Sequence, residues 1–463
     1  MKKTFFKISA ILITGAILFS CESWIDHDLN KSPNAPIDVP LSLLLPSTQG
    51  ALFYSFGGDH SRAPSIWMQH QSGVDRQAYG FDRFQYTESD VNNLWNTLNG
   101  NALKNLQDMR TKSAENESPH YSGVANLLTA LALGKKTDSW GDVPFYEAHQ
   151  GETGNLTPRY ESQETIYNVI DSLIDVSITQ LGATQSLFSP TSTADLIYRG
   201  DLEKWEKFGW TLKLRHKLHL SKRTGYQPAL DLLNNANANF LESHEDDFQF
   251  KFHTTSDARS PRFNFNDNRG DIRAGKYLVD MMVANDDPRL PVYFKEVEDV
   301  GYVGSGPAAQ VSAASWMGDF YGAMDAFVPV LTYDEFKFME AEILFNTGNA
   351  QGAADAYNEA VIASLAKHGV NDEAWEAIHA DEDAGSISME TIMMGKYVAL
   401  YLRAEVWVDY RRTGFPNDLP APADAVINQI PRRLPYPLGE RLYNGNNMPS
   451  GLTLTSRMWW DVD

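Results

Sequence analysis

The stretch TYDEFKFMEAEILFNTGNAQGAADAYNEAVIASLAKHG, residues 332–369, decides the fold class of this sequence. Apolar side chains recur in it at the three- and four-residue spacing of a helix face, before and after the turn-forming pair Gly348 and Asn349. The two apolar stripes consist of Phe336, Met339, Ile343 and Leu344 and of Ala354, Tyr357, Val361 and Leu365. This pattern predicts two antiparallel helices of about 15 residues, packed through alanines like a tetratricopeptide-type hairpin.

Amphipathic helical spacing also occurs in four other places along the chain. These are residues 124–131, residues 166–173 after the N-cap candidate Ser162, the segment from Asp201 onward, and residues 389–413. We therefore expect a mostly α-helical protein built from tetratricopeptide-like hairpins, with few short strands. The strict consensus of a repeat protein is absent, so the pattern does not establish a regular repeat array.

Four segments lack helical spacing and are rich in glycine, proline, asparagine, aspartate and aromatic residues. They are residues 56–90, 243–273, 300–327 and 417–463. We expect long irregular loops in all four, and loops of such length in a compact protein are usually functional.

The N-terminus has the pattern of an export signal. Basic Lys2 and Lys3 precede an apolar run at residues 8–19, which ends at Ser20 and Cys21. The run has about half of the ~20 residues that a membrane span requires, so a transmembrane anchor is the weaker alternative. An ordinary signal peptide is the other alternative, but the only cysteine of the chain falls where cleavage is expected.

These residues resemble a lipobox, in which the cysteine receives a diacylglycerol before cleavage. We therefore expect a lipoprotein signal peptide at residues 1–20, lipidation at Cys21, and a lipidated leader at residues 21–40. Prolines and turn formers in the leader predict an extended tether. Residues 41–463 are expected to form a single ligand-binding domain.

Composition excludes several classes of function. A single cysteine among 463 residues allows no intramolecular disulfide and no cysteine-rich zinc site. The formal net charge of −21 makes nucleic acids and anionic surfaces poor partners and favours neutral or cationic ligands. With 43% hydrophobic and 12% aromatic residues, the chain can fill a large core.

Several motifs resemble those of the SusD and RagB outer-membrane lipoproteins of Bacteroidetes nutrient-uptake systems, and in particular the second SusD-like subgroup. They occur in family order over nearly the whole mature chain. The matching segments are LNKSPN (29–34), DSWGDVPF (138–145), DLIY (195–198) before Gly200, Asp201 and Trp205, NDDPRL (285–290), TYDE (332–335), EVWVDYRRTG (405–414) and PRRLPYP (431–437).

The resemblance implies a SusD-like α/α superhelical architecture and a lipid-anchored, cell-surface location on the outer membrane. It implies that the protein captures an oligosaccharide and passes it unaltered to a SusC-like TonB-dependent transporter, with no cofactor. In the RagB branch the ligand is a peptide, which is the first alternative. The ligand-binding residues of the family vary between members, so the resemblance carries over no binding motif.

Two of the irregular segments contain the aromatic residues expected of a glycan-binding surface. Flat rings stack on the C–H faces of sugars, and amide or guanidinium groups pair with their hydroxyls. The candidates are Arg76, Tyr79 and Phe81 in the first segment and Tyr302, Trp316, Phe320 and Tyr321 in the third. The competing interpretation is that these rings anchor loops to the core, and solvent exposure separates the two.

Other chemistries are weighed against structural interpretations. A glycosidase needs two carboxylates across a cleft, and Glu405 and Asp409 are four residues apart on one predicted helix. Ion pairs that tie this helix to the C-terminal tail are the favoured interpretation. The basic partners nearby are Arg411, Arg412, Arg432 and Arg433. We assign no catalytic residue, although a surface glycoside hydrolase and a purely structural assembly subunit remain alternatives.

Two clusters are considered as metal sites. His216 and His219 lie among basic residues that would repel a cation, so a polar helix face is the favoured interpretation. An acidic cluster at residues 242–247 and a turn at 266–271 lack the EF-hand pattern of a calcium loop. A solvated acidic loop is the favoured interpretation there, and no metal ligand is assigned.

Overall fold

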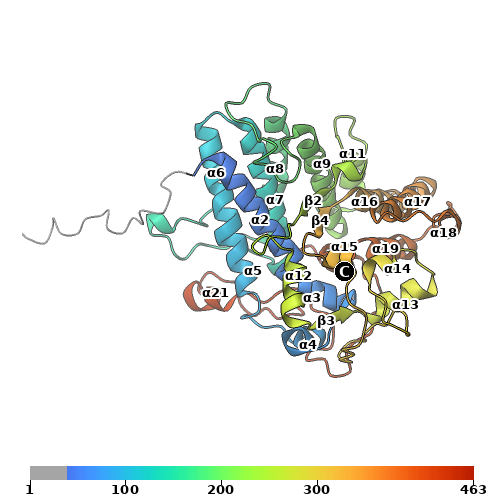
Figure 1. The fold of residues 1–463 in the computed structure, drawn as a ribbon. Coiled ribbons are helices and arrows are strands. Elements are labelled where there is room, and N and C mark those ends of the chain that lie inside the picture. The colour runs from blue at the N-terminus through green and yellow to red at the C-terminus, as the bar shows by residue number, and fades with distance from the viewer. Residues whose placement is uncertain (1–38) are drawn as a thin grey trace, which may run out of the picture. The chain divides into compact units, whose positions relative to one another are not determined.

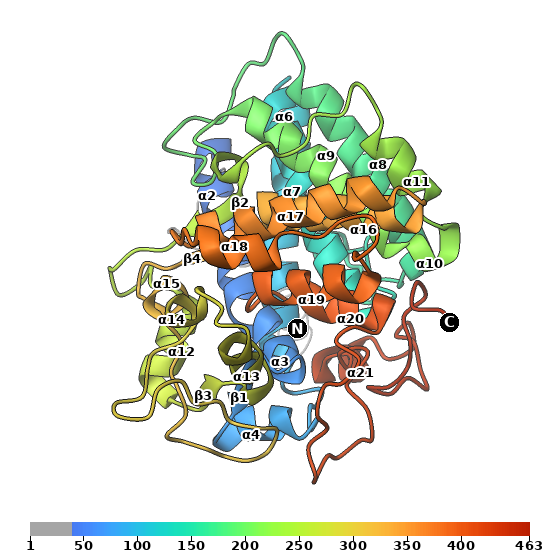
Figure 2. The ribbon, with the colours of Figure 1, turned by 90° about the vertical axis from the view of Figure 1, so that its right-hand side faces the viewer.

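The hairpin predicted at residues 332–369 is present. Helices α16 (Tyr333–Asn346) and α17 (Ala350–Lys367) lie side by side (Figure 2). Asn349 caps α17 because its side chain accepts a hydrogen bond from the backbone N–H of Gly352 at 3.0 Å. Alanines at the contact are buried in an apolar cluster that also includes α19 (Met389–Ala399). The prediction of a helical hairpin is therefore confirmed.

The computed structural model describes residues 39–463. Residues 41–463 of this part form one compact unit. The expected signal peptide at residues 1–20, the lipidation site Cys21 and all but the last two residues of the expected leader at 21–40 lie outside the described residues. No helix from residue 39 onward has the length and apolar character required to cross a membrane.

The fold is mostly helical with few short strands, as expected (Figure 1). The first half of the chain contains α2 (Leu41–Gly57), α3 (Asp59–Trp67), β1 (Gln71–Gly73), α4 (Arg76–Asp82), α5 (Asn92–Asn96), the π-helix η1 (Thr97–Leu103), α6 (Lys104–Glu115), α7 (Pro119–Trp140), η2 (Gly151–Thr153), α8 (Gln163–Leu181), α9 (Leu202–His219), α10 (Ser221–Thr224) and α11 (Gln227–Leu233).

The second half continues with shorter elements around the central hairpin. In chain order these are η3 (His244–Asp246), β2 (Phe248–Lys251), α12 (Pro261–Arg269), β3 (Ile272–Ala274), α13 (Lys276–Ala284), α14 (Leu290–Tyr293), α15 (Asp319–Gly322), β4 (Phe327–Leu331), α16, α17, α18 (Glu373–His379), α19, α20 (Glu405–Thr413) and α21 (Leu438–Tyr443).

A layer of long helices, α6, α7, α8 and α9, packs in sequence order (Figure 1). Ser162 caps α8 by accepting from the backbone N–H of Thr165, and Asp201 caps α9 in the same manner. These helices confirm the predictions at residues 166–173 and from Asp201. The helix predicted at 124–131 is present as α7, but it is buried on every side and is therefore not amphipathic.

Two antiparallel strand pairs connect distant parts of the chain. Strand β1 pairs with β3, with Ser72 opposite Arg273, and strand β2 pairs with β4, with Phe248 opposite Leu331. The second pair covers α2 and α9, where the ring of Phe248 stacks on Phe208 with centroids 3.8 Å apart. The first pair brings the segment after α3 against the segment after α12.

The helix predicted at residues 389–413 is broken in two. Helix α19 ends at Ala399, α20 begins at Glu405, and Leu402 between them has a positive φ of 63°. His70 bridges the break: its Nδ1 accepts from the N–H of Leu402, and its Nε2 lies 3.1 Å from the carbonyl oxygen of Tyr397. Apolar spacing continues through both helices, so the pattern does not reveal this tertiary contact.

Short helices occupy parts of the segments predicted as irregular. Helices α3 and α4 lie in 56–90 and α12 lies in 243–273, so the prediction of loops was wrong there. Turn-forming residues stand at the ends of these helices: Asp75 caps α4, Pro261 begins α12, and Gly270 ends α12 with a φ of 64°. The other two segments are irregular apart from the ends of β4 and the short helices α15 and α21.

Candidate functional site

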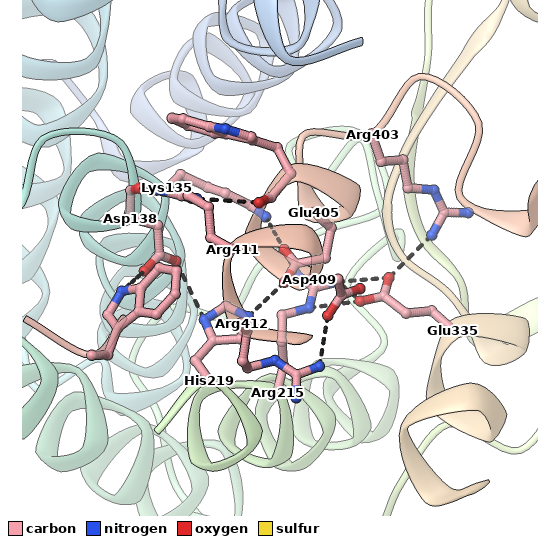
Figure 3. Close-up of polar contacts among 12 residues, drawn as sticks. Lys135, Asp138, Arg215, His219, Glu335, Arg403, Glu405, Asp409, Arg411 and Arg412 are labelled. Carbon is pink, nitrogen blue, oxygen red and sulfur yellow. Dashed lines mark hydrogen bonds and ion pairs between the residues drawn. The ribbon is translucent and has the colours of Figure 1, made fainter. Parts of the chain in front are cut away.

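Glu405, one of the two carboxylates considered for glycosidase chemistry, lies in a buried ionic network (Figure 3). It accepts a hydrogen bond from Lys135 Nζ at 2.6 Å, and its other oxygen lies 2.5 Å from His219 Nε2. Burial by itself would raise the pKa of Glu405, but Lys135, His219 and Arg215 hold that pKa well below its usual range. A general acid requires the opposite shift, so the geometry suits a structural ion pair.

Asp409 belongs to the same interior network. Its Oδ1 accepts a hydrogen bond from Arg412 Nη2 at 2.8 Å. Arg432 binds both the carbonyl oxygen of Arg411, at 2.8 Å, and the carboxylate of Asp461 near the C-terminus. The interpretation of Glu405 and Asp409 as members of buried ion pairs is therefore confirmed. The prediction that these pairs tie α20 to the C-terminal tail was wrong, because Glu405 takes its partners from α7 and α9 and Asp409 pairs with Arg412 of its own helix. The tail is held to α20 by the hydrogen bonds between Arg411 and Arg432.

The interpretation of His216 and His219 as a polar helix face was wrong, because both are buried. Helix α9 contacts α7, α8, α16 and α20, so these two imidazoles face other helices. His219 pairs with Glu405 and, at 3.4 Å, with Asp138, and His216 packs edge-on against Tyr167. Between residues 39 and 463, no group of three or more His, Cys, Asp or Glu side chains is arranged to hold a metal ion.

The interpretation of residues 242–247 as a solvated acidic loop was wrong for two members, Asp246 and Asp247, which are buried. Asp246 lies 3.2 Å from Lys207 Nζ. Asp247 accepts a hydrogen bond from the backbone N–H of Tyr333 at 2.8 Å, which holds the start of α16. The turn at 266–271 is the C-terminal end of α12. Asp246 and Asp247 thus both stabilise the fold.

Phe81, Phe320 and Tyr321, three of the aromatic ligand candidates, pack into the protein. Phe81 is buried against Tyr86, and its carbonyl oxygen accepts from Trp67 Nε1. Tyr321 is fully buried with its hydroxyl 2.7 Å from His368 Nε2, and Phe320 covers Tyr321 and the same imidazole. The loop-anchor interpretation describes Phe81 and Tyr321, because a buried ring offers a ligand no surface, whereas Phe320 is half-buried.

Three of the segments without helical spacing meet beside β3. Strand β1 pairs with β3, and the backbone N–H of Ala274 in β3 donates to the carbonyl oxygen of Ser315 at 2.9 Å. The neighbouring Trp316 is 39% exposed, and the guanidinium carbon of Arg273 lies 3.4 Å from its ring centroid. A cation over an indole ring at this distance holds the ring in place.

Arg76 lies on the other side of the turn that follows α12. Its Nε donates to Asp271 Oδ1 at 2.7 Å, and its Nη2 donates to the carbonyl oxygen of Arg269. Gly270 of this turn approaches the Trp316 ring so closely that a Cβ there would lie 3.3 Å from it. We refer to Arg76, Arg273 and Trp316 as the Trp316 surface.

Tyr79 and Tyr302, the remaining candidates, are both half-buried. The Tyr79 hydroxyl donates to Asp424 Oδ2 at 3.2 Å, and the guanidinium of Arg83 lies 5.4 Å from its ring centroid. Tyr302 precedes Val303, whose carbonyl oxygen accepts from the N–H of Ser315 beside Trp316. The backbone at Tyr302 thus lies beside the backbone at Trp316, and Tyr79 on α4 contacts the C-terminal segment at Asp424.

A cavity of about 430 Å³ lies beside α12, and we refer to it as the α12 cavity. Its lining combines aromatic, amide, hydroxyl, guanidinium and carboxylate groups: Tyr54, Ser55, Gly58, Asp59, Arg62, Asn93, Thr97, Pro261, Asn264, Phe265, Asn268 and Arg269. Tyr54, Asn93 and Asn268 are exposed, so the cavity faces solvent. Phe265 contacts two cations, with the guanidinium carbons of Arg62 and Arg269 at 3.8 and 5.2 Å from its ring centroid.

Sequence reasoning missed the α12 cavity. The signal was the alternation of phenylalanine and asparagine in FNFNDN, residues 263–268, which was interpreted as an irregular turn. On a helix that begins at Pro261, this alternation places Asn264 and Asn268 one turn apart and beside Phe265. The other walls come from α2, α3, α5 and η1, which no local pattern connects to α12.

The arrangement is suited to binding a polar, ring-shaped molecule. Rings at Tyr54, Phe265 and Trp316 offer faces for stacking, and the asparagine amides offer donors and acceptors for hydroxyl groups. Among the residues that line the α12 cavity, Asp59 is the one carboxylate, and it is paired with Arg62 at 2.6 Å. Two free carboxylates facing each other, as glycoside hydrolysis requires, are not found in this lining.

The molecule is thus a protein of tetratricopeptide-like helical hairpins with a solvent-facing polar cavity and an exposed tryptophan. The chain belongs to the SusD/RagB family: the model of its second SusD-like family, described as "Starch-binding associating with outer membrane", matches residues 33–437. This confirms the resemblance drawn from the sequence motifs.

Solved structures of SusD homologues have the same fold. A chitin-binding protein superposes with a TM-score of 0.79 at 24% identity, covering 92% of this chain and 100% of its own. A chitin-binding SusD homolog from Flavobacterium johnsoniae has a TM-score of 0.75 at 19% identity, covering 91% and 96%. A SusD/RagB family protein from Bacteroides thetaiotaomicron has a TM-score of 0.75 at 22% identity, covering 92% and 99%. No curated protein matches the sequence at a significant level.

Proposed function

We propose that this protein captures oligosaccharides at the cell surface, with the α12 cavity and the Trp316 surface as its binding site. The observation that carries the proposal is the position of Trp316. Its indole is exposed and is held by Arg273, which follows the turn at the end of α12, and the residues of α12 before that turn line the polar α12 cavity. A flat indole face presented to solvent beside amide and guanidinium groups is suited to stacking on a sugar ring.

Family membership and the neighbouring structures support a glycan as the ligand. The family description refers to starch binding, and two of the similar structures are named as chitin-binding. Starch and chitin are neutral polymers of pyranose rings, which stack on aromatic faces and offer hydroxyl groups to amides. The side chains of the α12 cavity and of the Trp316 surface supply both kinds of contact.

We further propose that capture involves no chemical change and that the ligand passes to a SusC-like TonB-dependent transporter in the outer membrane. Support for a non-catalytic role comes from the paired state of Asp59 in the cavity and from the burial of Glu405 and Asp409. Support for the transporter as partner comes from family membership. Incubation of the protein with a bound glycan should return the glycan at its original chain length, whereas shortened products would contradict this part of the proposal.

Replacement of Trp316 by alanine is expected to weaken glycan binding at least tenfold, because truncating a tryptophan hot spot typically costs ~2 kcal/mol or more. Isothermal titration of the wild type against a panel of starch, chitin and other oligosaccharides, with peptides included, would identify a ligand for the comparison. Tyr443→Ala is the matched control, because Tyr443 is 80% exposed on α21, away from the cavity lining. Selective peptide binding would instead favour the RagB-like alternative, and equal affinity of both variants would exclude the Trp316 surface.

Replacement of Cys21 by serine is expected to abolish lipid attachment and to release the protein from the membrane fraction. We propose Cys21 as the acylated residue because it follows the apolar run at residues 8–19 and is the only cysteine of the chain. Metabolic labelling with an alkyne fatty acid and fractionation of cells would measure both effects. Ser23→Ala is the control, and label on the Cys21→Ser variant would contradict the assignment.

A further inference from the structure

Arg262, in the first turn of α12, is a buried cation without an anionic partner. It is 7% exposed, its Nη2 donates to the carbonyl oxygen of Leu402 at 3.3 Å, and its Nη1 has no hydrogen-bond partner. Burial lowers the pKa of Arg262 to about 10, and the titratable neighbours that act on it are the neutral phenols of Tyr321 and Tyr401 and the cation Arg403. No carboxylate of the described chain therefore compensates this guanidinium.

The charges of other interior arginines are compensated by carboxylates or by several backbone carbonyl groups. Arg215 is bidentate to Glu335, and Arg412 binds Asp409 (Figure 3). Arg412 also binds Glu342, and Arg289 is bidentate to Asp287. Arg411 has no direct carboxylate partner but donates to three backbone carbonyl groups and stacks on Trp407. Arg262 has one long hydrogen bond, although an uncompensated buried charge costs several kcal/mol.

The unpartnered guanidinium lines a small cavity of about 20 Å³, which we call the Arg262 cavity. Its lining contains two cations and several uncharged polar groups but no carboxylate: Gly57, Gly58, Ser61, Arg62, Gln71, Arg262, Phe265, Asn266, Ile272, Met317 and Leu402. Asn266 Oδ1 is buried there without a partner, and a half-turn of the amide would present its NH₂ group to an anion. The volume admits one water-sized group, such as an oxygen of a carboxylate.

The Arg262 cavity adjoins the α12 cavity. Gly58, Arg62 and Phe265 line both, so these three residues form a wall that the two cavities share. A sugar ring in the α12 cavity would therefore hold its substituents close to Arg262. The formal charge of −21 disfavours anions elsewhere on this protein. The Arg262 cavity is a local exception, because its lining contains no acid and, of its two arginines, only Arg62 is paired, with Asp59.

We propose that the Arg262 cavity is an anion subsite, and that it receives the carboxylate of an acidic sugar unit in the captured glycan. This inference rests on the proposed function, since the glycan must occupy the α12 cavity. The carboxylate would accept hydrogen bonds from Arg262 Nη1 and from the Asn266 amide, and the pairing would compensate the buried charge. The same cavity could be filled by a small free anion, and the two sources are separated by experiment.

The first arm of the experiment compares an oligogalacturonate with its carboxyl-reduced, neutral counterpart by isothermal titration against the mature protein. The wild type is expected to bind the acidic form at least 30-fold more tightly, because a buried charge-assisted pair is typically worth 2 kcal/mol or more. Arg262→Met is expected to remove this preference. Arg259→Met is the matched control, because Arg259 lies just before the same helix and its Nε donates to a backbone carbonyl oxygen.

A second variant keeps Arg262 and blocks its cavity. Asn266→Leu adds apolar volume at the lining, and the Asn266 side chain makes no hydrogen bond within the described residues that this change would break. It is expected to remove the preference for the acidic form while leaving the thermal midpoint near that of the wild type. Agreement between the two variants would separate loss of the anion subsite from misfolding.

The second arm measures thermal unfolding in sodium formate and, at equal ionic strength, in the salt of a bulky sulfonate. If formate raises the midpoint of the wild type but not of Arg262→Met, while acidic and neutral glycans bind alike, the subsite holds a free anion and its assignment to the glycan is overturned. If formate has no effect and the acidic form is not preferred, the anion subsite itself is overturned. Because this arm uses no glycan, it remains decisive even if the proposed glycan capture fails.

Discussion

Replacing Glu405 with glutamine is expected to lower the free energy of unfolding by about 3–5 kcal/mol, the typical cost of breaking a buried ion pair. The change leaves Lys135, His219 and Arg215 in the interior without their shared anion. These residues come from α7 and α9, so the loss would loosen the contact between the helical layer and α20 (Figure 3). Urea unfolding monitored by circular dichroism measures the effect.

Glu203→Gln is the matched control for this experiment. Glu203 is 72% exposed at the start of α9 and lies 4.0 Å from Lys207, so its replacement should change stability by no more than ~0.5 kcal/mol. A loss below ~1 kcal/mol for Glu405→Gln would show that the interior cations do not depend on this carboxylate.

Acidification from pH 6.5 to 4.5 is expected to destabilise the protein strongly, because four histidines are buried in the neutral form. Burial lowers the pKa of His60, His70, His216 and His368 to about 3. Each of them contributes stability that is complete above its unfolded pKa of about 6.5 and is lost as pH falls towards 3, at up to ~1.4 kcal/mol per pH unit. Urea midpoints measured at several pH values test this expectation.

Groups whose pKa is raised in the folded protein do not cancel this loss of stability between pH 6.5 and 4.5. Burial raises the pKa of Asp82 to about 7, so its contribution is complete below its unfolded pKa and is lost as pH rises through about 7. Burial would lower the pKa of His219, but Glu405 and Asp138 raise it, so its contribution disappears above pH 6.5. Between pH 6.5 and 4.5 the stability lost through the four histidines exceeds the stability gained through Asp82, so the protein is destabilised on acidification.

The variant His216→Leu isolates one of these contributions. His216 Nδ1 has no hydrogen-bond partner, so the change removes a titrating group without breaking a hydrogen bond at that atom. The slope of stability against pH between 6.5 and 4.5 should decrease by up to ~1.4 kcal/mol per pH unit, and His253→Leu, at an exposed histidine, should leave it unchanged. An unaltered slope for His216→Leu would contradict the assignment of His216 as a buried neutral group.

Periodic spacing predicted the long helices because each has enough turns to show its own pattern. Helices α8, α9, α16 and α17 were predicted together with the caps Ser162 and Asp201. The short helices α3, α4 and α12 have about two and a half turns or fewer, and Asn, Asp, Gly and Pro residues in and around them suggested loops. Their stability comes from packing on distant segments, which local spacing does not record.

The aromatic candidates show the same limit at the site. Trp316 and Tyr321 stand five residues apart in one segment of similar composition. Tyr321 is buried because Tyr293, Tyr401 and His368, from three distant segments, surround its ring. Trp316 faces solvent because Gly270 and Arg273 cover only part of its ring. Exposure, which decides between loop anchor and ligand contact, depends on these neighbours.

The sequence by itself determined the helical class, the hairpin at residues 332–369, the family and the expectation of lipidation at Cys21. Each of these depends on residues close together in the chain, as spacing, caps or motifs. Tertiary structure decided the break at Leu402, the burial of Glu405 and the exposure of Trp316. The position of Arg262 beside a cavity without an anionic partner also depends on tertiary structure, because the groups around its guanidinium come from α2, α3, β1 and the break before α20. Burial and charge compensation are properties of the neighbours in space, and the fold brings those neighbours together.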